Sequence, residues 1–433
     1  MQTSAFIKKI NDRSATIGVV GLGYVGLPLL MAFSRKGFRT LGFDIDKEKC
    51  KRLMRGESYI KHIPAAAVKA LRNFEAVTDF DRVGEADAVI ICVPTPLTPN
   101  MDPDMTYIVN TVEGIGPHLR KGQLISLEST TYPGTTDEIV VPGLEQHSGL
   151  KAGRDFWVSF SPEREDPVNK KYSTTTIPKV VGGHTAACMA VAAAVYGAVI
   201  ETIVPVSDTR TAEAVKLMEN IFRGVNIALV NELKIIFDRM GIDIWEVVNA
   251  AKTKPFGFMP FYPGPGLGGH CIPIDPFYLA WKAKEFGVRA RFIELAGEVN
   301  QGMPEYVLHK TMEGLNRARK PMTGARILIV GMAYKPDVDD MRESPSLELL
   351  TLFRENGATV DYHDPFIAAL PATRKHPDLA GQRSVPLARA GSYDCVVVST
   401  AHSGIDYAGM VKRAKLVVDT RNACPRGPKV IRA

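Results

Sequence analysis

The sequence lacks the features of several protein classes. It has six cysteines in 433 residues, at positions 50, 92, 188, 271, 395 and 424, and no C-x-x-C pair. This scatter suggests neither a disulfide framework nor a zinc site, and we expect no metal. Residues 1–14 lack the apolar core of a signal peptide, and the longest apolar stretch, Ala186–Ile200, is alanine-rich and too short to span a bilayer. We therefore expect a cytoplasmic protein with no membrane partner.

The chain also has little excess of charge of one sign. Its 53 basic and 47 acidic residues give a net charge of +6 at pH 7, and no basic block of the kind that follows a nucleic acid occurs. We expect no nucleic-acid partner, whereas a mild positive charge suits an anionic small molecule. Hydrophobic residues make up 45% of a chain that is too long for one ordinary core, so two or three globular domains are expected.

What the sequence does contain is a loop, Pro263–Pro276, in which glycines and prolines surround one cysteine. We predict a helix that has Asp275 as its N-cap and Pro276 at its first position and that continues over Phe277–Phe286. Cys271 would then lie just before a helix N-terminus, whose partial positive charge favours the nucleophilic thiolate. The loop suits covalent chemistry on an electrophilic carbon. A helix-capping loop with a small buried cysteine explains this stretch equally well.

A dinucleotide-binding pattern opens the chain. Strand Thr16–Val20 is followed by Gly21-Leu22-Gly23-Tyr24-Val25-Gly26, helix Leu27–Lys36, strand Phe38–Phe43 and Asp44. The glycines permit a tight turn and let a pyrophosphate approach the helix N-terminus. Asp44 would accept hydrogen bonds from the adenosine ribose, which favours NAD over NADP. Lys49 could reach the same cofactor, or could lie on a solvated helix face.

Two threonines follow the next predicted strands. Strand Asp87–Val93 leads to Thr95, and strand Gln123–Glu128 leads to Thr130. Loops after the carboxyl ends of parallel strands line the ligand crevice of a doubly wound sheet. Both threonines are therefore candidates for contact with the nicotinamide half of the cofactor, and the alternative is that they are ordinary turn residues.

Carboxylates follow one further strand. Strand Asp155–Ser161 delivers Glu163 and Glu165 to the same predicted edge. We nominate these two carboxylates for proton transfer or for positioning water, with an exposed surface loop as the alternative.

The middle of the chain is predicted to be helical. A long apolar pattern without proline predicts a helix over Asp208–Met240, in which Lys216 and Asn220 are four residues apart and lie one above the other. These two donors could stabilise a developing oxyanion, or they could form a solvated stripe on a helix that links domains. Helical segments at Trp245–Ala250 and Arg291–Gly302 flank the cysteine loop.

A second nucleotide-fold pattern occupies the C-terminal part. Its predicted elements are strand and turn Ala325–Lys335, helix Ser346–Asn356, and strands Thr359–Tyr362, Cys395–Thr400 and Lys415–Thr420. It lacks a complete G-x-G-x-x-G, so we expect it to bind a different ligand from the first, and Lys335 and Arg342 are cations suited to phosphate. The predicted class is α/β, with two Rossmann-like doubly wound domains (1–205 and 316–433) joined by a central helical domain (206–315) with a long connecting helix.

These motifs occur in one characteristic order. They are Gly21–Gly26, Val93–Pro96, Ser129-Thr130, Ser161–Arg164, Lys216 with Asn220, the loop with Cys271 and Asp275, Gly331–Lys335 and Asp340–Ser344. Together they resemble the UDP-glucose/GDP-mannose dehydrogenase family over essentially the whole chain. The segment Pro255–Tyr262, which leads into the glycine-rich loop, is most similar to the branch acting on UDP-N-acetyl-D-glucosamine (UDP-GlcNAc).

The resemblance implies an oxidoreductase that uses NAD to convert the C6 alcohol of a UDP-N-acetylhexosamine into a carboxylate. Two NAD are reduced per sugar, and Cys271 forms first a thiohemiacetal and then a thioester that water hydrolyses. UDP-N-acetyl-D-mannosamine (UDP-ManNAc), UDP-glucose and GDP-mannose are the alternative substrates. Lys252–Phe256 stands where glucose-type members usually have an arginine, which puts glucose in doubt, and Val168 stands where a glycine is expected.

The resemblance also implies roles for individual residues. The implied catalytic residues are Cys271, Lys216, Asn220, Asp275, Glu163 and Thr130; Glu165 and Arg342 join the cofactor contacts named above; and the substrate contacts are Glu163, Arg164, Lys216, Asn220, Tyr262, Gly264, Gly268, Tyr334 and Lys335. Lys216 and Asn220 would stabilise alkoxide-like states, and Asp275 would assist the water or the thiol. The family suggests a homodimer or a higher homo-oligomer, and a uronic acid product that feeds polysaccharide biosynthesis.

Two other functions stay open at this point. A two-electron dehydrogenase that stops at an aldehyde or ketone would not need Cys271. A nucleotide-sugar sensor without turnover would bind both ligands and leave them unchanged.

Overall fold

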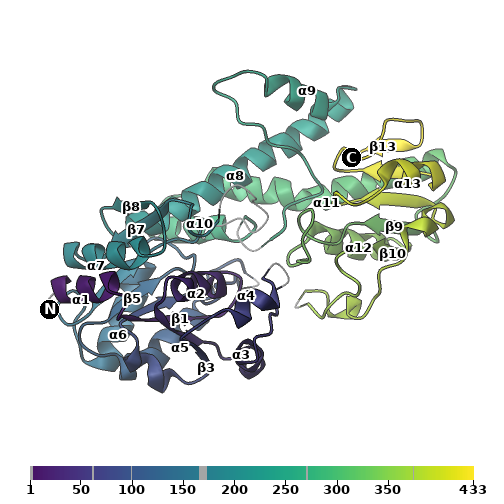
Figure 1. The fold of residues 1–433 in the computed structure, drawn as a ribbon. Coiled ribbons are helices and arrows are strands. Elements are labelled where there is room, and N and C mark those ends of the chain that lie inside the picture. Colours follow the sequence, from purple (N-terminus) through teal and green to yellow (C-terminus); the bar gives the residue numbers. More distant parts are fainter. Residues whose placement is uncertain (1–2, 61–62, 99, 165–172, 270–271, 374) are drawn as a thin grey trace. The chain divides into compact units, whose positions relative to one another are not determined.

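The computed structural model describes residues 3–60, 63–98, 100–164, 173–269, 272–373 and 375–433. Cys271, Glu165 and Val168 lie outside the described residues, so their predicted roles stay predictions. The chain folds into two compact units (Figure 1). Unit 1 comprises Met1–Glu219 and Phe277–Val288, and unit 2 comprises Asn220–Pro276 and Arg289–Ala433.

Unit 1 is built on a sheet which, within the described residues, has eight strands in the order β3-β2-β1-β4-β5-β6-β7-β8. The strands are β1 (Thr16–Val20), β2 (Arg39–Phe43), β3 (Phe74–Val77), β4 (Ala88–Ile91), β5 (Leu124–Leu127), β6 (Trp157–Phe160), β7 (Lys179–Gly183) and β8 (Ile203–Val206). Neighbours are parallel except β6 and β7, which pair antiparallel. The strand order reverses between β1 and β4, and a ligand crevice forms at the carboxyl edge of such a point.

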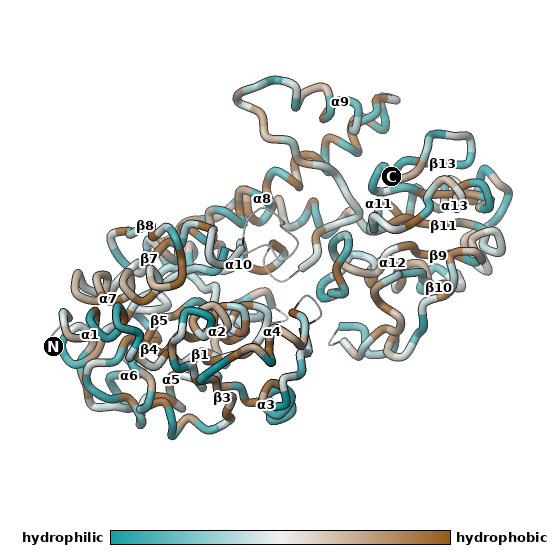
Figure 2. Tube along the Cα trace, viewed as in Figure 1, coloured by the Kyte–Doolittle hydropathy of each residue, from teal (hydrophilic) through white to brown (hydrophobic). Residues whose placement is uncertain are grey.

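Helices cover both faces of this sheet because successive strand residues point to opposite faces. Val19 and Ile90 belong to a core cluster that includes residues of α2 and α7, whereas Val89 and Ile91 belong to a second cluster with residues of α5 and α6. The strands accordingly contain long brown stretches in Figure 2. The helical segments of unit 1 are α1 (Thr3–Asn11), α2 (Gly26–Arg35), α3 (Lys47–Met54), α4 (Ala65–Lys69), η1 (Phe80–Glu85), α5 (Thr106–Ile115), η2 (Gly116–His118), η3 (Thr136–Val140), α6 (Val141–Ser148) and α7 (Ala186–Gly197).

Two helices have residues in both units. Helix α8 (Thr209–Arg239) confirms the long helix expected over 208–240, and α10 (Asp275–Glu285) confirms the helix after the glycine-rich loop. Asp275 is the first residue of α10 rather than the N-cap that we predicted, which is a shift of one position.

Unit 2 contains a parallel sheet which, in the part of the chain described, has five strands in the order β10-β9-β11-β12-β13. These are β9 (Arg326–Val330), β10 (Thr359–His363), β11 (Cys395–Val398), β12 (Val417–Asp419) and β13 (Val430–Arg432). Its helical segments besides α8 are α9 (Ile244–Ala251), α11 (Arg291–Arg317), α12 (Pro345–Glu355), η4 (Pro377–Leu379), η5 (Leu387–Ser392) and α13 (Tyr407–Arg413). The α/β class with two Rossmann-like sheets and a helical middle is confirmed.

Helix α11 is longer than predicted. We expected it to end at Gly302, but it runs through Pro304 to Arg317. A proline inside a helix removes one backbone hydrogen bond. Beyond it, Val307 and Leu315 are buried in the core of the C-terminal sheet. This packing offsets the local cost of the proline, and a sequence pattern alone does not show it.

None of the helices in the described ranges is both long and apolar enough to cross a membrane. The described cysteines, at positions 50, 92, 188, 395 and 424, are all free thiols.

Candidate active site

The first part of the site is the turn between β1 and α2. Gly21 has a φ of +91°, and a Cβ there would lie 2.6 Å from the carbonyl oxygen of Cys92. A Cβ on Gly26 would overlap the carbonyl oxygen of Gly21. At Gly23, by contrast, no atom of the described residues lies within 4 Å of an added Cβ. The outer two glycines are therefore required by the packing of the turn, and the middle one leaves the backbone open to a ligand.

Asp44 lies beside this turn at the end of β2. One carboxylate oxygen accepts a hydrogen bond from Leu22 N (3.0 Å), and the other accepts one from Asp46 N (2.9 Å). The ammonium of Lys49 is 3.6 Å from the same carboxylate. Val25, with its apolar side chain, stands at the N-cap of α2, so the first N–H groups of that helix can bind an anion. These residues fit the pyrophosphate and the ribose of a dinucleotide.

The loops after β4 and β5 contact each other. The Thr95 hydroxyl donates to the carbonyl oxygen of Thr130 at 2.7 Å, and the Tyr278 hydroxyl of α10 donates to the carbonyl oxygen of Thr95. Glu213 of α8 accepts hydrogen bonds from the backbone N–H groups of Gly134 (2.6 Å) and Thr136 (2.9 Å). Two helices thus hold the threonine loops at the carboxyl edge of the first sheet.

The segment after β6 is held by α8. The Lys216 ammonium, in a side chain that is largely buried, donates to the main-chain carbonyl oxygen of Glu163. Arg164 donates to the carbonyl oxygen of Pro178 (2.7 Å) and forms an ion pair with Glu219 of α8 (2.6 Å). The structure therefore brings together Lys216, Glu163 and Arg164, each of which was predicted to contact the substrate.

Unit 2 pairs two further predicted residues. The Asn220 side-chain amide of α8 donates to a carboxylate oxygen of Asp275 at 2.6 Å, and both side chains are buried. Asp275 opens α10, four residues after Cys271 in the sequence. A charge-assisted hydrogen bond of this length fixes the carboxylate in one orientation.

The start of the glycine-rich loop is held by buried polar groups. Gly264 N donates to the side-chain oxygen of Asn231 at 3.0 Å, and Asn231 in turn donates to Asn300 at 2.9 Å. A Cβ on Gly264 would overlap the guanidinium of Arg421. Burial lowers the pKa of Arg421 to about 10, so the group still carries its charge at neutral pH.

The end of the described part of this loop lies against the turn after β9. A Cβ on Gly268 would lie 2.7 Å from the Cβ of Tyr334, and Gly269 N donates to the carbonyl oxygen of Arg342 at 3.2 Å. Lys335 follows Tyr334 in the same turn, and the Arg342 guanidinium pairs with Asp340 at 2.6 Å. The glycine-rich loop therefore packs on the carboxyl edge of the second sheet.

Tyr262 has a different environment. Its ring stacks on Trp245 of α9 with a centroid distance of 5.4 Å, and its hydroxyl donates to Asn249 at 3.2 Å. The ring is 38% exposed, so one side remains open to a ligand.

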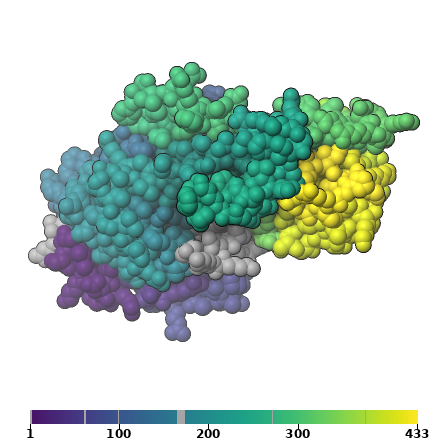
Figure 3. All heavy atoms as spheres, turned by 90° about the horizontal axis from the view of Figure 1, so that it is seen from above, coloured from purple at the N-terminus to yellow at the C-terminus, as the bar shows by residue number. Residues whose placement is uncertain are grey.

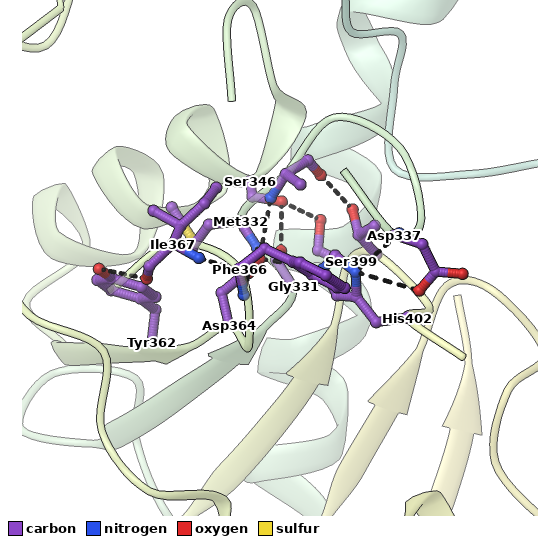
Figure 4. A network of polar contacts seen from close by, with 12 residues as sticks. Gly331, Met332, Asp337, Ser346, Tyr362, Asp364, Phe366, Ile367, Ser399 and His402 are labelled. Atoms are coloured by element: carbon purple, nitrogen blue, oxygen red, sulfur yellow. Dashed lines mark hydrogen bonds and ion pairs between the residues drawn. The ribbon is translucent and has the colours of Figure 1, made fainter. Parts of the chain in front are cut away.

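Asp364 occupies the position after β10 that Asp44 occupies after β2. Its donors are Met332 N (2.7 Å), Ala333 N (3.1 Å) and His402 Nε2 (3.0 Å) on one oxygen, and Phe366 N (2.8 Å) and Ile367 N (3.0 Å) on the other. Figure 4 shows this carboxylate enclosed by its own domain. A carboxylate offers about four lone-pair sites, so five donors leave it little capacity to accept hydrogen bonds from a ribose, in contrast to Asp44.

The turn after β9 is held from a second side. His402 accepts a hydrogen bond on Nδ1 from Asp337 N at 3.0 Å, so its hydrogen lies on Nε2 and is donated to Asp364 (Figure 4). The Ser346 hydroxyl contacts the carbonyl oxygen of Gly331 (2.8 Å) and the hydroxyl of Ser399 (2.7 Å). The turn that carries Tyr334 and Lys335 is therefore rigidly built.

Replacement of Asp364 by asparagine tests this arrangement. Burial would raise the pKa of Asp364, but the hydrogen bonds from His402 and the backbone lower it below its usual value of 3.8. The carboxylate therefore stabilises unit 2 above about pH 4, and this contribution is lost as the pH falls through the folded-state pKa. We expect Asp364→Asn to cost about 2 to 4 kcal/mol at pH 7, because an amide N–H₂ group would face buried donors.

The measurement is hydrogen exchange of the Met332 and Ala333 amides, with the exposed Asp378→Asn as control. Protection should fall strongly at pH 7 in the Asp364 variant alone, and the difference from wild type should shrink as the pH falls through the folded-state pKa of Asp364. Equal protection in both variants at pH 7 would refute the role given to this carboxylate.

Sequence reasoning missed several residues of the site. Arg421 follows β12, so its position after a predicted strand was a usable signal. Asn231 lies within the apolar pattern of α8, and His402 reaches Asp364 only through the fold. Glu128 was assigned only to the end of a strand, and Lys179 was not considered.

The two sheets define an enzyme class. One carboxyl edge is built for a dinucleotide, and the other carries a rigid turn and a glycine-rich loop for a different ligand. Three family models match the chain: the NAD binding domain over residues 15–200, the central domain over residues 210–302 and the UDP binding domain over residues 328–426. The chain therefore belongs to the UDP-glucose/GDP-mannose dehydrogenase family, it is an NAD-dependent nucleotide-sugar dehydrogenase, and NAD as cofactor is confirmed.

Individual relatives differ in the sugar that they are named for. The chain is 37% identical to UDP-N-acetyl-D-glucosamine 6-dehydrogenase of Pseudomonas aeruginosa, covering 92% of this chain and 93% of that protein. It is 34% identical to UDP-N-acetyl-D-mannosamine dehydrogenase of Methanococcus maripaludis, covering 94% and 92%. The solved UDP-ManNAc dehydrogenase of Pyrococcus horikoshii has a TM-score of 0.86 at 31% identity and covers 95% of this chain and 97% of that one.

Proposed function

We propose that this enzyme oxidises the C6 alcohol of a UDP-N-acetylhexosamine, with UDP-GlcNAc as the first candidate, to a carboxylate through a covalent adduct on Cys271. The observation that carries the proposal is the packing of the glycine-rich loop on the carboxyl edge of the second sheet. Asp275, four residues past Cys271, is held there by its hydrogen bond from Asn220. A loop that packs on the UDP binding domain would bring its cysteine close to the bound sugar.

The proposed chemistry assigns a task to each residue. NAD, when bound, supplies the hydride acceptor for both oxidations. Lys216 and Asn220, one turn apart on α8, donate hydrogen bonds to the developing oxyanion. The Cys271 sulfur adds to the intermediate aldehyde as a thiohemiacetal, and the second oxidation leaves a thioester.

Water then hydrolyses the thioester. Glu163 and Thr130 are proposed to position that water and to accept its proton, and Asp275 to assist. The hydrogen bond from Asn220 sets the direction of the Asp275 carboxylate before any ligand arrives. Lys335 and Tyr334, in the rigid turn after β9, are proposed to contact the nucleotide sugar.

The choice of sugar rests on finer support. The 37% identical relative is named for UDP-GlcNAc, and the segment Pro255–Tyr262 resembles that branch. Other relatives at 34% identity are named for UDP-ManNAc and for an NDP-N-acetyl-D-galactosaminuronic acid. UDP-ManNAc is therefore the second candidate for the same chemistry.

The test is the amount of NADH formed per mole of limiting sugar, with UDP-GlcNAc, UDP-ManNAc, UDP-glucose and GDP-mannose in parallel. We expect two NADH per UDP-GlcNAc and much slower reaction with the others. One NADH per sugar would favour a two-electron dehydrogenase, and binding without NADH would favour a sensor.

We also propose that the protein is a cytoplasmic homodimer. Phe222, Leu229 and Ile236 recur every seven residues on α8 and are 45%, 52% and 45% exposed, which is unusual for large apolar side chains. Helix α9 (Ile244–Ala251), which the colour bar of Figure 3 places near residue 250, lies at the molecular surface in that view. The mass in solution, measured by light scattering, should be twice 47.3 kDa. A monomer would contradict this assignment.

A further inference from the structure

A buried ammonium lies between two carboxylates at the carboxyl edge of the first sheet. The Lys179 Nζ is 3.0 Å from a carboxylate oxygen of Glu128 and 3.6 Å from one of Glu163. The side chains of Lys179, Glu128 and Glu163 are 6%, 0% and 15% exposed. Charges are buried this deeply only when they are paired, so the three groups form one unit.

The sheet topology places these groups together. Glu128 directly follows β5, Glu163 lies three residues past β6, and Lys179 opens β7. Strands β6 and β7 are antiparallel, with Phe160 opposite Gly182. Continuing that register by three residues sets Lys179 directly opposite Glu163. The Ser161 hydroxyl, which donates to the carbonyl oxygen of Val180 at 2.7 Å, keeps the two segments together beyond the paired residues.

Other groups face the cluster from the surrounding elements. Lys216 of α8 donates to the main-chain oxygen of Glu163, Cys92 approaches from the end of β4, and the Tyr196 ring of α7 lies 5.3 Å from the Lys179 ammonium. Burial alone would lower the pKa of Lys179, but the two carboxylates raise it above its usual value of 10.5, so the ammonium stays charged. Burial raises the pKa of Glu128, against the effect of Lys179.

Stability alone does not account for this arrangement. The free energy of desolvating a buried ion pair is about as large as the attraction between its charges. Apolar residues of similar volume therefore often stabilise a core equally well. Here the pair lies beside a carboxylate whose backbone is already held by Lys216. Lys179 thus restrains the side chain of Glu163, and Lys216 restrains its main chain.

We propose that the Glu128–Lys179 pair is a positioning device that orients the Glu163 carboxylate for its part in the reaction. This inference rests on the proposed function, in which Glu163 positions water and accepts a proton. Glu128 contributes by sharing the ammonium, which limits how strongly Lys179 binds Glu163. Removing Lys179 should therefore release the Glu163 carboxylate, whereas removing Glu128 should make the ammonium bind it more strongly.

The variants follow from this balance. In Lys179→Met the ammonium between the two carboxylates is lost, and Lys216 still holds only the main chain of Glu163, so the Glu163 carboxylate loses its fixed direction. In Glu128→Gln the ammonium serves Glu163 alone, so it holds that carboxylate more tightly. We expect kcat at neutral pH to fall about 10- to 100-fold in Lys179→Met, with both KM values within about threefold of wild type.

Two further variants separate positioning from folding. The double variant Glu128→Leu with Lys179→Met removes the buried charges together, so it should fold stably and still lack the oriented carboxylate. Lys151→Met removes an exposed ion pair to Glu145 in the same unit and should behave as wild type. A folded double variant with the kcat of wild type would overturn the proposal.

A readout without turnover keeps this inference distinct from the proposed function. Carbon-13 NMR of labelled glutamate, assigned with Glu163→Gln, observes the Glu163 carboxyl directly. A changed carboxyl chemical shift in Lys179→Met and in Glu128→Gln, with none in Lys151→Met, supports the inference even if no sugar is oxidised. Unchanged chemical shifts in both variants overturn it even if wild type oxidises UDP-GlcNAc.

Discussion

Replacing Cys271 by serine is expected to abolish the conversion of UDP-GlcNAc to its uronic acid, with a loss of rate of about 1,000-fold or more. A serine hydroxyl is not ionised at neutral pH and forms no thioester, so the second oxidation has no covalent intermediate to act on. Only the first, reversible oxidation to the aldehyde would remain.

The measurement is NADH per sugar together with mass spectrometry of the product. The control is Cys424→Ser, a buried thiol remote in sequence from the glycine-rich loop. It should retain two NADH per sugar. Full yield of the uronic acid from Cys271→Ser would show that the cysteine is not the nucleophile, and water would then have to add directly to the aldehyde before the second oxidation.

Gly23→Ala is expected to weaken NAD binding by about 100-fold while leaving the stability of the ligand-free protein unchanged. No described atom lies within 4 Å of an added Cβ at Gly23, so the folded chain accommodates the methyl group. The same methyl group would occupy the space through which a pyrophosphate approaches the backbone of the turn. The loss should therefore appear only when the cofactor is added.

Gly26→Ala provides the contrast, since its Cβ would overlap the carbonyl oxygen of Gly21. It should lower the melting temperature of the ligand-free protein as well. Gly197→Ala is the matched control, because its Cβ would make an ordinary contact of 3.7 Å with Ile203. Calorimetric titration measures the affinity of each variant for NAD, and thermal unfolding without NAD measures the stability of the ligand-free protein. Wild-type affinity in Gly23→Ala would place the pyrophosphate elsewhere.

The two sheets show how one topology serves two ligands. In each, a glycine follows the first strand, with φ of +91° at Gly21 and +89° at Gly331, and an acid follows the second strand. Asp44 has one backbone donor from the turn and lies next to the open Gly23, whereas Asp364 is closed off by five donors that include His402.

Much of the candidate site could be read from the chain itself. The strand, turn, helix, strand and acid around Gly21–Asp44 are local in sequence, and their spacing already implies which groups meet. The same holds for Lys216 and Asn220, since residues four apart on a helix must share a face. The order of strand ends also placed Thr95 and Thr130 at one predicted crevice, and the structure joins their loops by a hydrogen bond.

Other features depended on contacts between distant segments. Lys179 faces Glu163 because β7 runs antiparallel to β6, and no local pattern reveals a strand direction. Helix α11 continues past Pro304 because the core of unit 2 covers its far half.

The sequence by itself determined the fold class, the family, the dinucleotide turn and the residues nominated for catalysis. These follow from periodicity and from motifs whose members are neighbours along the chain. Only the tertiary structure decided that Asp275 pairs with Asn220, that Arg421 and Asn231 hold the glycine-rich loop, and that a buried lysine lies between Glu128 and Glu163. The physical reason is that burial and charge pairing depend on which distant segments pack together, and that depends on strand register and direction.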